Sequence, residues 1–145
     1  MATVPKIFIS YSHKDGVWLD RLQEQFAPLA RNALLNAWDD SRIKPGTIWR
    51  DEIAKAIADA DVAVLLVTPG FLASEFIANN ELEPLLAKKH VFWIAVRHSN
   101  YEQTEIADYQ SANDPAKPLA SLRGDARNKA LVEICKKILA AVQNP

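Results

Sequence analysis

The strongest strand signal in the chain is the run DVAVLLVTPG at residues 61–70. Its apolar character is continuous, without the alternation of polar and apolar side chains seen in half-exposed strands. Such a run is typical of a central parallel strand that helices cover on both faces, and it predicts a strand over residues 61–68. Pro69 and Gly70 then end the strand, because both residues favour turns. The chain is therefore expected to have an α/β fold.

Further strands and helices alternate on either side of this run. Apolar runs predict strands over residues 6–11, 34–38 and 91–96, and residues 118–120 are expected to add a short edge strand. Apolar side chains at spacings of three and four indicate amphipathic helices. The alternation predicts a parallel sheet with helices on both faces. The helices are expected over residues 17–29, over residues 49–60, from Ser74 onward, and over residues 128–142.

In sheets of this kind, ligands bind at the carboxyl ends of the strands. The polar residues that directly follow predicted strands are therefore candidates for a site: Ser10 to Ser12, Asp39–Asp40, and Thr68. Asp39 and Asp40 are adjacent, so their side chains are expected to point apart, which favours a turn role over a carboxylate pair.

Composition bounds the size and the partners of the protein. The 145 residues are 49% hydrophobic and 24% charged, which is typical of one folded domain over residues 1–145. A net charge of −1 argues against nucleic acid or an anionic membrane as the main partner. No run approaches the ~20 apolar residues that span a bilayer. The single cysteine, Cys135, excludes a disulfide framework, and a reducing, cytoplasmic setting fits best.

Several common chemistries lack their motifs. The four glycines form neither G-x-G-x-x-G nor the phosphate-binding G-x-x-x-x-G-K-[ST], and no G-x-S-x-G elbow occurs. His13, His90 and His98 lack the paired spacing of a zinc site, so no metal is expected. A phospho-acceptor receiver domain would share the architecture, but it needs acidic residues after the first strand. This chain has Ser10-Tyr11-Ser12 there.

The loop from Asp39 to Trp49 combines two cations with a turn signal. Arg42 and Lys44 precede Pro45-Gly46, a pair that favours a tight turn. The loop either presents these cations to a ligand or partner, or it is an ordinary surface turn with solvated charges. Trp49 likewise has two interpretations, because it can pack in the core with the next helix or stack on a ligand.

Glu81 is a carboxylate in an apolar setting. On the expected helix its face is shared by Ile77, Ala78 and Leu85. A carboxylate there is costly unless it borders a cleft, where desolvation would raise its pKa as suits a catalytic group. Pro84 is expected to kink or restart the helix just beyond Glu81. The alternative is that Glu81 is a boundary residue that reaches solvent.

Several segments, taken in order along the chain, resemble the motifs of Toll/interleukin-1 receptor (TIR) domains. Their sequences are more similar to the bacterial members of that family than to the animal receptors. The resemblance runs from about residue 5 to residue 97. It implies a flavodoxin-like, three-layer α/β/α fold with a five-stranded parallel sheet. The matching segments are KIFISYS at 6–12 with Asp15, the BB loop at 39–46, the helix start at 49–53, the central strand at 61–69, and the third helix at 71–77 with Glu81-Leu82.

Many bacterial members of this family cleave the nicotinamide–ribose bond of NAD+, releasing nicotinamide and ADP-ribose or a cyclised form. The resemblance therefore implies an NAD+ nucleosidase (NADase) with NAD+ as substrate and no cofactor. Glu81 matches the essential glutamate of the family, and its expected role is to stabilise developing positive charge on the ribose. The implied substrate-binding residues are Tyr11, Ser12 and His13 after the first strand, Asp39, Arg42 and Lys44 of the loop, Trp49 after it, and Ile77, where other members often have an aromatic.

The family also implies partners. TIR domains associate with one another through the BB loop, here Arg42, Ile43, Lys44, Pro45 and Gly46. A head-to-tail contact of this kind can extend into a filament. TIR domains are commonly joined to sensor modules, so the chain can be the N-terminal part of a longer protein. We expect NAD+ cleavage in bacterial defence or cell-death signalling, activated by self-association. The alternative is a non-catalytic adaptor or effector that acts through the BB loop.

Overall fold

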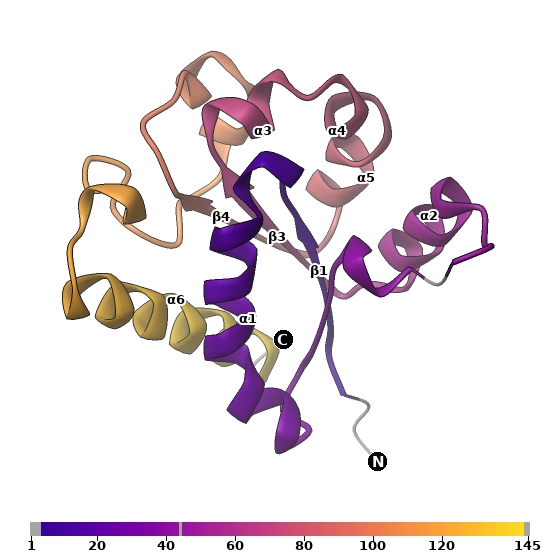
Figure 1. Cartoon of the computed structure of the whole chain (residues 1–145), viewed down its shortest axis with the longest axis horizontal. Helices are drawn as coiled ribbons and strands as arrows, with labels where there is room; N and C mark the ends of the chain where they lie inside the picture. Colours follow the sequence, from indigo (N-terminus) through magenta and orange to yellow (C-terminus); the bar gives the residue numbers. More distant parts are fainter. Residues whose placement is uncertain (1–3, 44, 144–145) are drawn as a thin grey trace.

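A computed structural model describes residues 4–43 and 45–143, and its centre is a parallel sheet (Figure 1). In the described residues the sheet has four strands in the order β2-β1-β3-β4. All six residues of β3 are buried, which confirms the central strand predicted over residues 61–68. The strands are β1 (Lys6–Ser10), β2 (Asn36–Trp38), β3 (Val62–Val67) and β4 (His90–Ala95).

Different helices cover the two faces of the sheet. α1 and α6 pack on one face, and α2 to α5 contribute the core residues on the other. This is the expected three-layer α/β/α arrangement. The helices are α1 (Gly16–Arg31), α2 (Trp49–Asp59), α3 (Pro69–Ala73), α4 (Glu75–Asn80), α5 (Leu82–Leu86) and α6 (Asp125–Gln143). Short 3₁₀ turns are η1 (His13–Asp15), η2 (Asp40–Arg42), η3 (Tyr101–Gln103), η4 (Glu105–Asp108) and η5 (Leu119–Ser121).

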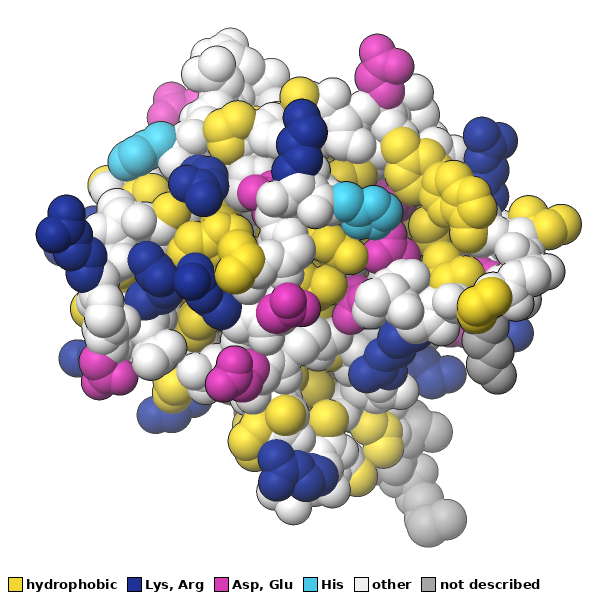
Figure 2. Space-filling view, in the orientation of Figure 1, with side chains coloured by type: hydrophobic (Ala, Val, Ile, Leu, Met, Phe, Trp, Pro, Cys, Tyr) yellow, Lys and Arg dark blue, Asp and Glu magenta, His cyan; other side chains and the backbone are white. Residues whose placement is uncertain are grey.

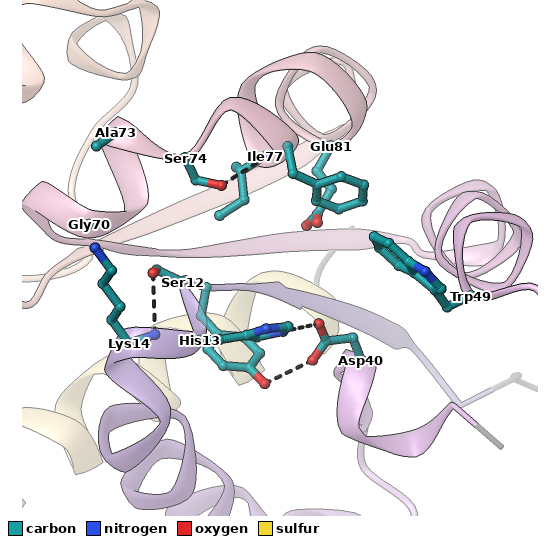
Figure 3. A pocket seen from close by; sticks show the side chains of 12 residues that line it. Ser12, His13, Lys14, Asp40, Trp49, Gly70, Ala73, Ser74, Ile77 and Glu81 are labelled. Atoms are coloured by element: carbon teal, nitrogen blue, oxygen red, sulfur yellow. Dashed lines mark hydrogen bonds and ion pairs between the residues drawn. The ribbon is translucent and has the colours of Figure 1, made fainter. Parts of the chain in front are cut away.

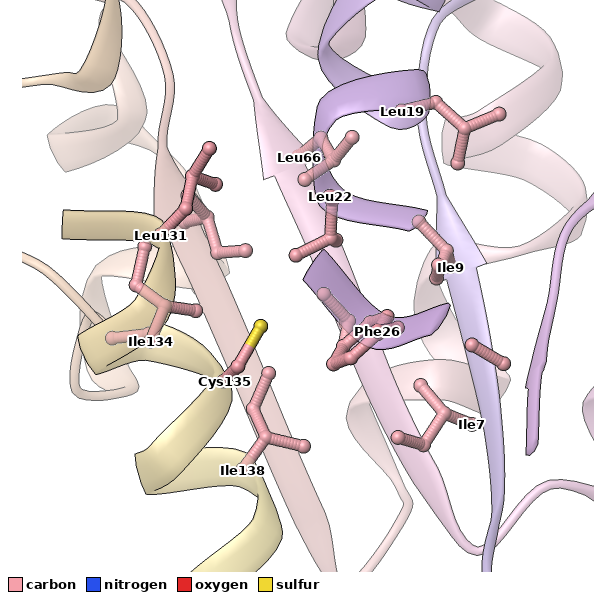
Figure 4. Close-up of a cluster of buried hydrophobic side chains, with 14 of the residues drawn as sticks. Ile7, Ile9, Leu19, Leu22, Phe26, Leu66, Leu131, Ile134, Cys135 and Ile138 are labelled. Carbon is pink, nitrogen blue, oxygen red and sulfur yellow. The ribbon is translucent and has the colours of Figure 1, made fainter. Parts of the chain in front are cut away.

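Successive residues of a strand face opposite layers, so the core is divided in two. Ile7 and Ile9 of β1 pack on the side of α1 and α6, whereas Phe8 between them packs on the side of α2 to α5. The second cluster also contains Ile53 and Ile57, which lie one helical turn apart on α2. Figure 4 shows the first cluster, in which α1 contributes Leu19, Leu22 and Phe26 and α6 contributes Leu131, Ile134, Cys135 and Ile138.

α6 closes the domain as an amphipathic helix, and it starts three residues before the predicted range of 128–142. Its buried positions recur every three or four residues, which matches the helical period. Cys135 is among them, and burial raises the pKa of its thiol to about 12, so this cysteine packs as a small apolar side chain. None of the helices in the described part of the chain has the length and the apolar character needed to cross a membrane.

The segment after β3 begins with a short helix that the sequence did not predict. Pro69 and Gly70 are turn-forming residues, yet they open α3. Thr68 makes this possible, because its Oγ1 accepts a hydrogen bond from the backbone N–H of Phe71 at 3.0 Å. Pro69 occupies the first turn of α3, where backbone N–H groups have no acceptor within the helix. The N–H that proline lacks therefore costs no helical hydrogen bond.

The helix expected from Ser74 is interrupted where Pro84 predicts a restart. Ser74 caps α4, since its Oγ accepts a hydrogen bond from the N–H of Ile77 at 3.2 Å. α4 ends at Asn80, and α5 begins at Leu82. Pro84 lies in the first turn of α5, so its missing N–H breaks no helical hydrogen bond there. Glu81 is therefore placed at the break between two helices.

The expected fifth strand is not formed in the described residues. Residues 118–120, predicted as an edge strand, are largely a 3₁₀ turn, and only the N–H of Ala120 reaches the sheet, at the carbonyl of Val96 (2.9 Å). Beside β4 lies a single parallel bridge between Trp93 and Ser111. The side chain of Asn113 replaces further strand pairing, because its amide bonds the N–H and the C=O of Ala95 at 2.8 and 3.0 Å.

Asn113→Ala is expected to lower the free energy of unfolding by about 1–2 kcal/mol, because two hydrogen bonds at the edge of β4 are lost together. Chemical denaturation measures this change. Asn100→Ala, an exposed asparagine without a side-chain capping bond, is the matched control and should be neutral. Equal stability of the two variants would show that Asn113 does not substitute for a strand.

Candidate active site

A cleft opens at the carboxyl ends of β1 and β3, the two central strands. The chain moves outward from β1 to β2 on one side and from β3 to β4 on the other, so the cleft lies where the strand order reverses. Its volume is about 410 Å³, within the range of small-molecule sites. The lining comes from residues 11–14 after β1, from Asp40, from Trp49, and from the segment between Gly70 and Glu81 (Figure 3).

Glu81 is buried at the cleft, with only 6% of its surface exposed. Ser10, the last residue of β1, donates a hydrogen bond from Oγ to Glu81 Oε1 at 2.8 Å. No other described residue donates to the carboxylate, and Glu81 lines the cleft. The alternative in which Glu81 reaches solvent as a boundary residue is therefore wrong, because the break between α4 and α5 turns its side chain inward.

Burial sets the acidity of this group. The pKa of Glu81 is raised from 4.5 to about 7: desolvation is the largest cause and the negative charge of Asp40 adds to it, whereas the Ser10 hydrogen bond and His13 act in the opposite direction. A carboxyl with a pKa near neutrality changes charge in the physiological range. Perturbed groups of this kind in clefts are typical of catalytic sites.

Trp49 and Phe76 form an aromatic wall of the cleft. Their ring centroids are 4.8 Å apart and the rings are tilted by 47°. Trp49 is 47% exposed, so the interpretation of this residue as part of the core is wrong. Ile77, at the position where an aromatic was noted as common, lines the cleft but is buried. The neighbouring Phe76 supplies an aromatic face instead.

The opposite wall comes from the segment after β1. Tyr11 and His13 line the cleft with ring centroids 5.4 Å apart. The Tyr11 hydroxyl donates to Asp40 Oδ1 at 2.8 Å, and His13 Nε2 pairs with Asp40 Oδ2. Desolvation, followed by the hydrogen bond to Asp40, raises the pKa of Tyr11 well above its usual value, so it remains a neutral donor.

The segments that follow the two central strands come close together at Ser12 and Gly70. A Cβ at Gly70 would lie 3.3 Å from Ser12 Oγ, a tight contact to which the serine side chain would have to adjust. Next to them, Thr68 Oγ1 donates to the buried carboxylate of Asp15 at 2.6 Å. Ser12 also accepts from the backbone N–H of Lys14 at 3.4 Å. These contacts connect the segment after β1 with the segment after β3 beside the cleft.

Two predicted substrate-binding residues of the loop, Asp39 and Arg42, lie apart from this cleft within one chain. Asp39 is buried and accepts hydrogen bonds from Gln23 Nε2 and from the N–H of Ser41, at 2.9 and 2.8 Å. Arg42 donates to Asn36 Oδ1 at 3.1 Å. Neither residue lines the cleft. Asp39 and Asp40 thus point apart, as predicted.

The remaining loop residues form the expected turn. Ile43 is half-buried against the second core cluster, whereas Pro45 and Gly46 are exposed. Gly46 has a φ of +87°, which glycine adopts without strain. Lys44 lies outside the described residues.

Sequence reasoning named the Asp39–Asp40 pair but assigned substrate binding to Asp39 alone, and it missed Phe76 and the Ser10–Glu81 hydrogen bond. Asp40 is adjacent to the predicted Asp39, and Phe76 is adjacent to the predicted Ile77. The sequence does not show which of two neighbouring side chains faces the cleft. Ser10 and Glu81 are separated by 71 residues, and no local pattern links them. Among the described residues, His, Cys, Asp and Glu side chains form no group of three that could hold a metal ion.

Apolar and titratable side chains meet on the face that carries the cleft. In Figure 2, hydrophobic side chains gather between α2 and α4, beside a histidine and acidic side chains. An apolar wall next to polar groups is suited to a ligand that has both a ring and polar substituents.

Comparison with known proteins identifies the family. The profile of the TIR domain family matches residues 7–130, which is most of the chain. The uncharacterized protein y4lF of Sinorhizobium fredii (strain NBRC 101917 / NGR234) is 33% identical over 91 residues, covering 60% of this chain. The match spans only 27% of that relative's length. With this family match and the parallel α/β fold, the chain belongs to the TIR domain family.

Proposed function

We propose that this TIR domain is an NAD+ glycohydrolase that cleaves the nicotinamide–ribose bond. The observation that carries the proposal is Glu81: a buried carboxylate, held by Ser10, whose pKa is raised to about 7 at a cleft on the carboxyl edge of the sheet. Its products are nicotinamide and ADP-ribose or a cyclic form. We further propose a cytoplasmic role in bacterial defence or cell-death signalling.

The chemistry needs a negative charge near the ribose. When the C1′–N bond breaks, the pyridinium nitrogen takes the electron pair and nicotinamide leaves neutral. The ribose then carries oxocarbenium character. In the ionised form, the Glu81 carboxylate stabilises this positive charge from a buried position, where electrostatic effects are stronger than in water. Water then adds to C1′ and loses a proton, or a second nucleophile of the same molecule attacks and closes a ring.

The rest of the cleft suits the substrate. Trp49 and Phe76 offer an aromatic face for the nicotinamide or adenine ring. Tyr11, Ser12 and His13 line the opposite side, where they can contact hydroxyl and phosphate groups. Arg42 lies outside the cleft of its own chain, so we propose that a BB loop from a neighbouring copy completes the pyrophosphate site. TIR domains commonly self-associate, and such a head-to-tail contact can extend into a filament.

Trp49→Ala is expected to raise KM for NAD+ about five- to tenfold, because one of the two stacking rings is removed. Trp49→Phe keeps an aromatic face and should recover most of the affinity. Steady-state kinetics at one state of assembly measures both. An unchanged KM in the alanine variant would exclude a stacking role.

The proposal is tested by incubating the concentrated protein with NAD+ and separating the products by chromatography. Light scattering of the same sample reports its assembly. We expect one nicotinamide for each NAD+ consumed, together with ADP-ribose or a cyclic isomer. An assembled sample that releases no nicotinamide above a buffer blank would overturn the proposal.

A second candidate function is favoured by the exposed surface beside the BB loop. Ile48 is 69% exposed and Trp49 is 47% exposed, next to the exposed Pro45-Gly46 turn. Large apolar side chains at a loop tip are typical of protein interaction sites. An adaptor would bind another TIR domain without NAD+ turnover, and Ile48→Asp would abolish that binding.

A further inference from the structure

Asp40 joins two segments that are far apart in sequence. It opens η2 at the start of the BB-loop segment 39–46, and its partners Tyr11 and His13 follow β1. Each carboxylate oxygen has its own partner: Oδ1 accepts from the Tyr11 hydroxyl, and Oδ2 pairs with His13 Nε2. Asp40 is thus the anchor for two aromatic rings that line the cleft (Figure 3).

The anchor matters because, apart from its contact with the Tyr11 ring, the His13 side chain is held by Asp40. It is 76% exposed, whereas Asp40 is 23% exposed. An exposed ring without a partner samples several rotamers, and ordering it on ligand binding costs free energy. The bond to Asp40 orders it in advance. Removal of Asp40 costs one part-buried hydrogen bond, from Tyr11, and one exposed contact with His13, a loss that should leave the fold intact.

Asp40 and its two partners also border a second hollow on the side of the BB loop. This hollow has a volume of about 440 Å³, and its lining includes Ile43 and Trp49 as well as Tyr11, His13 and Asp40. Tyr11, His13 and Asp40 therefore lie between the cleft and the second hollow.

Asp40 also acts on Glu81 through its charge. The titratable or charged side chains that line the cleft with Glu81 are Tyr11, His13, Lys14 and Asp40. Asp40 raises the pKa of Glu81, and His13 lowers it. Replacing Asp40 by a neutral residue should therefore make Glu81 more acidic.

We propose that Asp40 is a positioning residue of this site: it fixes Tyr11 and His13 as one wall of the cleft and thereby sets how NAD+ is held opposite Glu81. This inference rests on the proposed function. Asp40 does not react with the substrate but acts through the two rings that it holds.

Four variants separate the two effects of Asp40. Asp40→Ala removes both hydrogen bonds and the charge, and Asp40→Asn removes the charge but keeps an oxygen that can accept from Tyr11. Tyr11→Phe removes one hydrogen bond and leaves the charge. Glu83→Gln is the matched control, because Glu83 is an exposed carboxylate that does not line the cleft.

Steady-state kinetics should distinguish these variants by their KM for NAD+ and by the pH dependence of their rates. We expect Asp40→Ala to raise KM for NAD+ about tenfold and Tyr11→Phe about threefold, with kcat at alkaline pH changed less than KM. In both Asp40 variants the acid limb of the pH–rate profile should move to lower pH, whereas Tyr11→Phe and Glu83→Gln should leave it in place. A merely structural defect would lower the rate without moving this limb.

A titration of the Glu81 carboxyl carbon by NMR provides a readout without turnover. Asp40→Asn should lower the measured pKa. NAD+ affinity is compared separately in the Glu81→Gln background, where turnover is expected to be slow, and there Asp40→Ala should weaken NAD+ binding about tenfold. If the wild type releases no nicotinamide, the proposed function fails, and NAD+ binding still decides the inference. Asp40→Ala with wild-type NAD+ affinity and an unmoved Glu81 titration would overturn it, as would a wild type that does not bind NAD+.

Discussion

Glu81→Gln is expected to reduce nicotinamide release from NAD+ by about 100-fold or more. Loss of one well-placed electrostatic group typically costs that much, because the positive charge of the transition state then faces a neutral amide. Glutamine has nearly the volume of glutamate, and its Oε1 can still accept the hydrogen bond from Ser10. The loss would therefore be due to charge and not to packing. Initial rates at matched protein concentration and assembly measure it.

The control for this experiment is again Glu83→Gln, which removes an exposed carboxylate two positions away. It should retain the wild-type rate. Circular dichroism and light scattering establish that all three proteins fold and assemble alike. A Glu81→Gln variant with more than about one tenth of the wild-type rate would contradict the assignment of Glu81, since electrostatic stabilisation of this kind is worth more than tenfold.

The same substitution is expected to stabilise the protein at neutral and alkaline pH. The folded state holds a proton on Glu81 up to a pKa of about 7, whereas the unfolded chain releases it near 4.5. Because the folded state binds more protons in this window, stability falls as the pH rises from 4.5 to 7. Each pH unit of the window costs about 1.4 kcal/mol, so ionised Glu81 destabilises the fold by about 3 kcal/mol at pH 8. Gln has no such cost.

Chemical denaturation at pH 5 and pH 8 measures this effect. The gain of Glu81→Gln over the wild type should be small at pH 5 and reach about 3 kcal/mol at pH 8. Glu83→Gln should show no pH-dependent gain. A variant that is less stable than the wild type at pH 8 would show that the carboxylate is a structural element. The expected outcome is a residue that costs stability and is retained for its chemistry.

The fold could be predicted from β3 outward because burial on both faces leaves a simple pattern. A run with no polar residue between Val62 and Val67 admits few structures other than a central parallel strand. The amphipathic stripes of α1, α2 and α6 follow from the helical period. Both patterns are formed by residues that are close together in the sequence, so they can be recognised without the structure.

The edge of the sheet could not be predicted in the same way. Residues 118–120 are apolar and begin with a proline, which is also the pattern of an edge strand. The competing solution, in which the Asn113 amide bonds the backbone of Ala95, depends on a side chain meeting a strand end 18 residues earlier. Similarly, α3 depends on a cap by Thr68 that overrides the turn preference of Pro69-Gly70.

The site shows the same division. Glu81 was a candidate because its apolar neighbours and Pro84 are local signals, and the structure places it at the cleft. Asp39 and Arg42 were candidates as well, but their side chains bond Gln23 and Asn36 away from it. Whether a residue at the end of a strand faces the cleft is decided by the turn that follows, and a shift of one position exchanges Asp39 for Asp40.

The most direct test of the account is the pH–rate profile of nicotinamide release by the assembled wild-type protein, measured between pH 5 and pH 9. We expect the rate to rise with pH through an inflection near 7, where Glu81 ionises, and to level off above it. Release that is independent of pH across this range would contradict the role of ionised Glu81. The absence of release at every pH would contradict NAD+ cleavage itself.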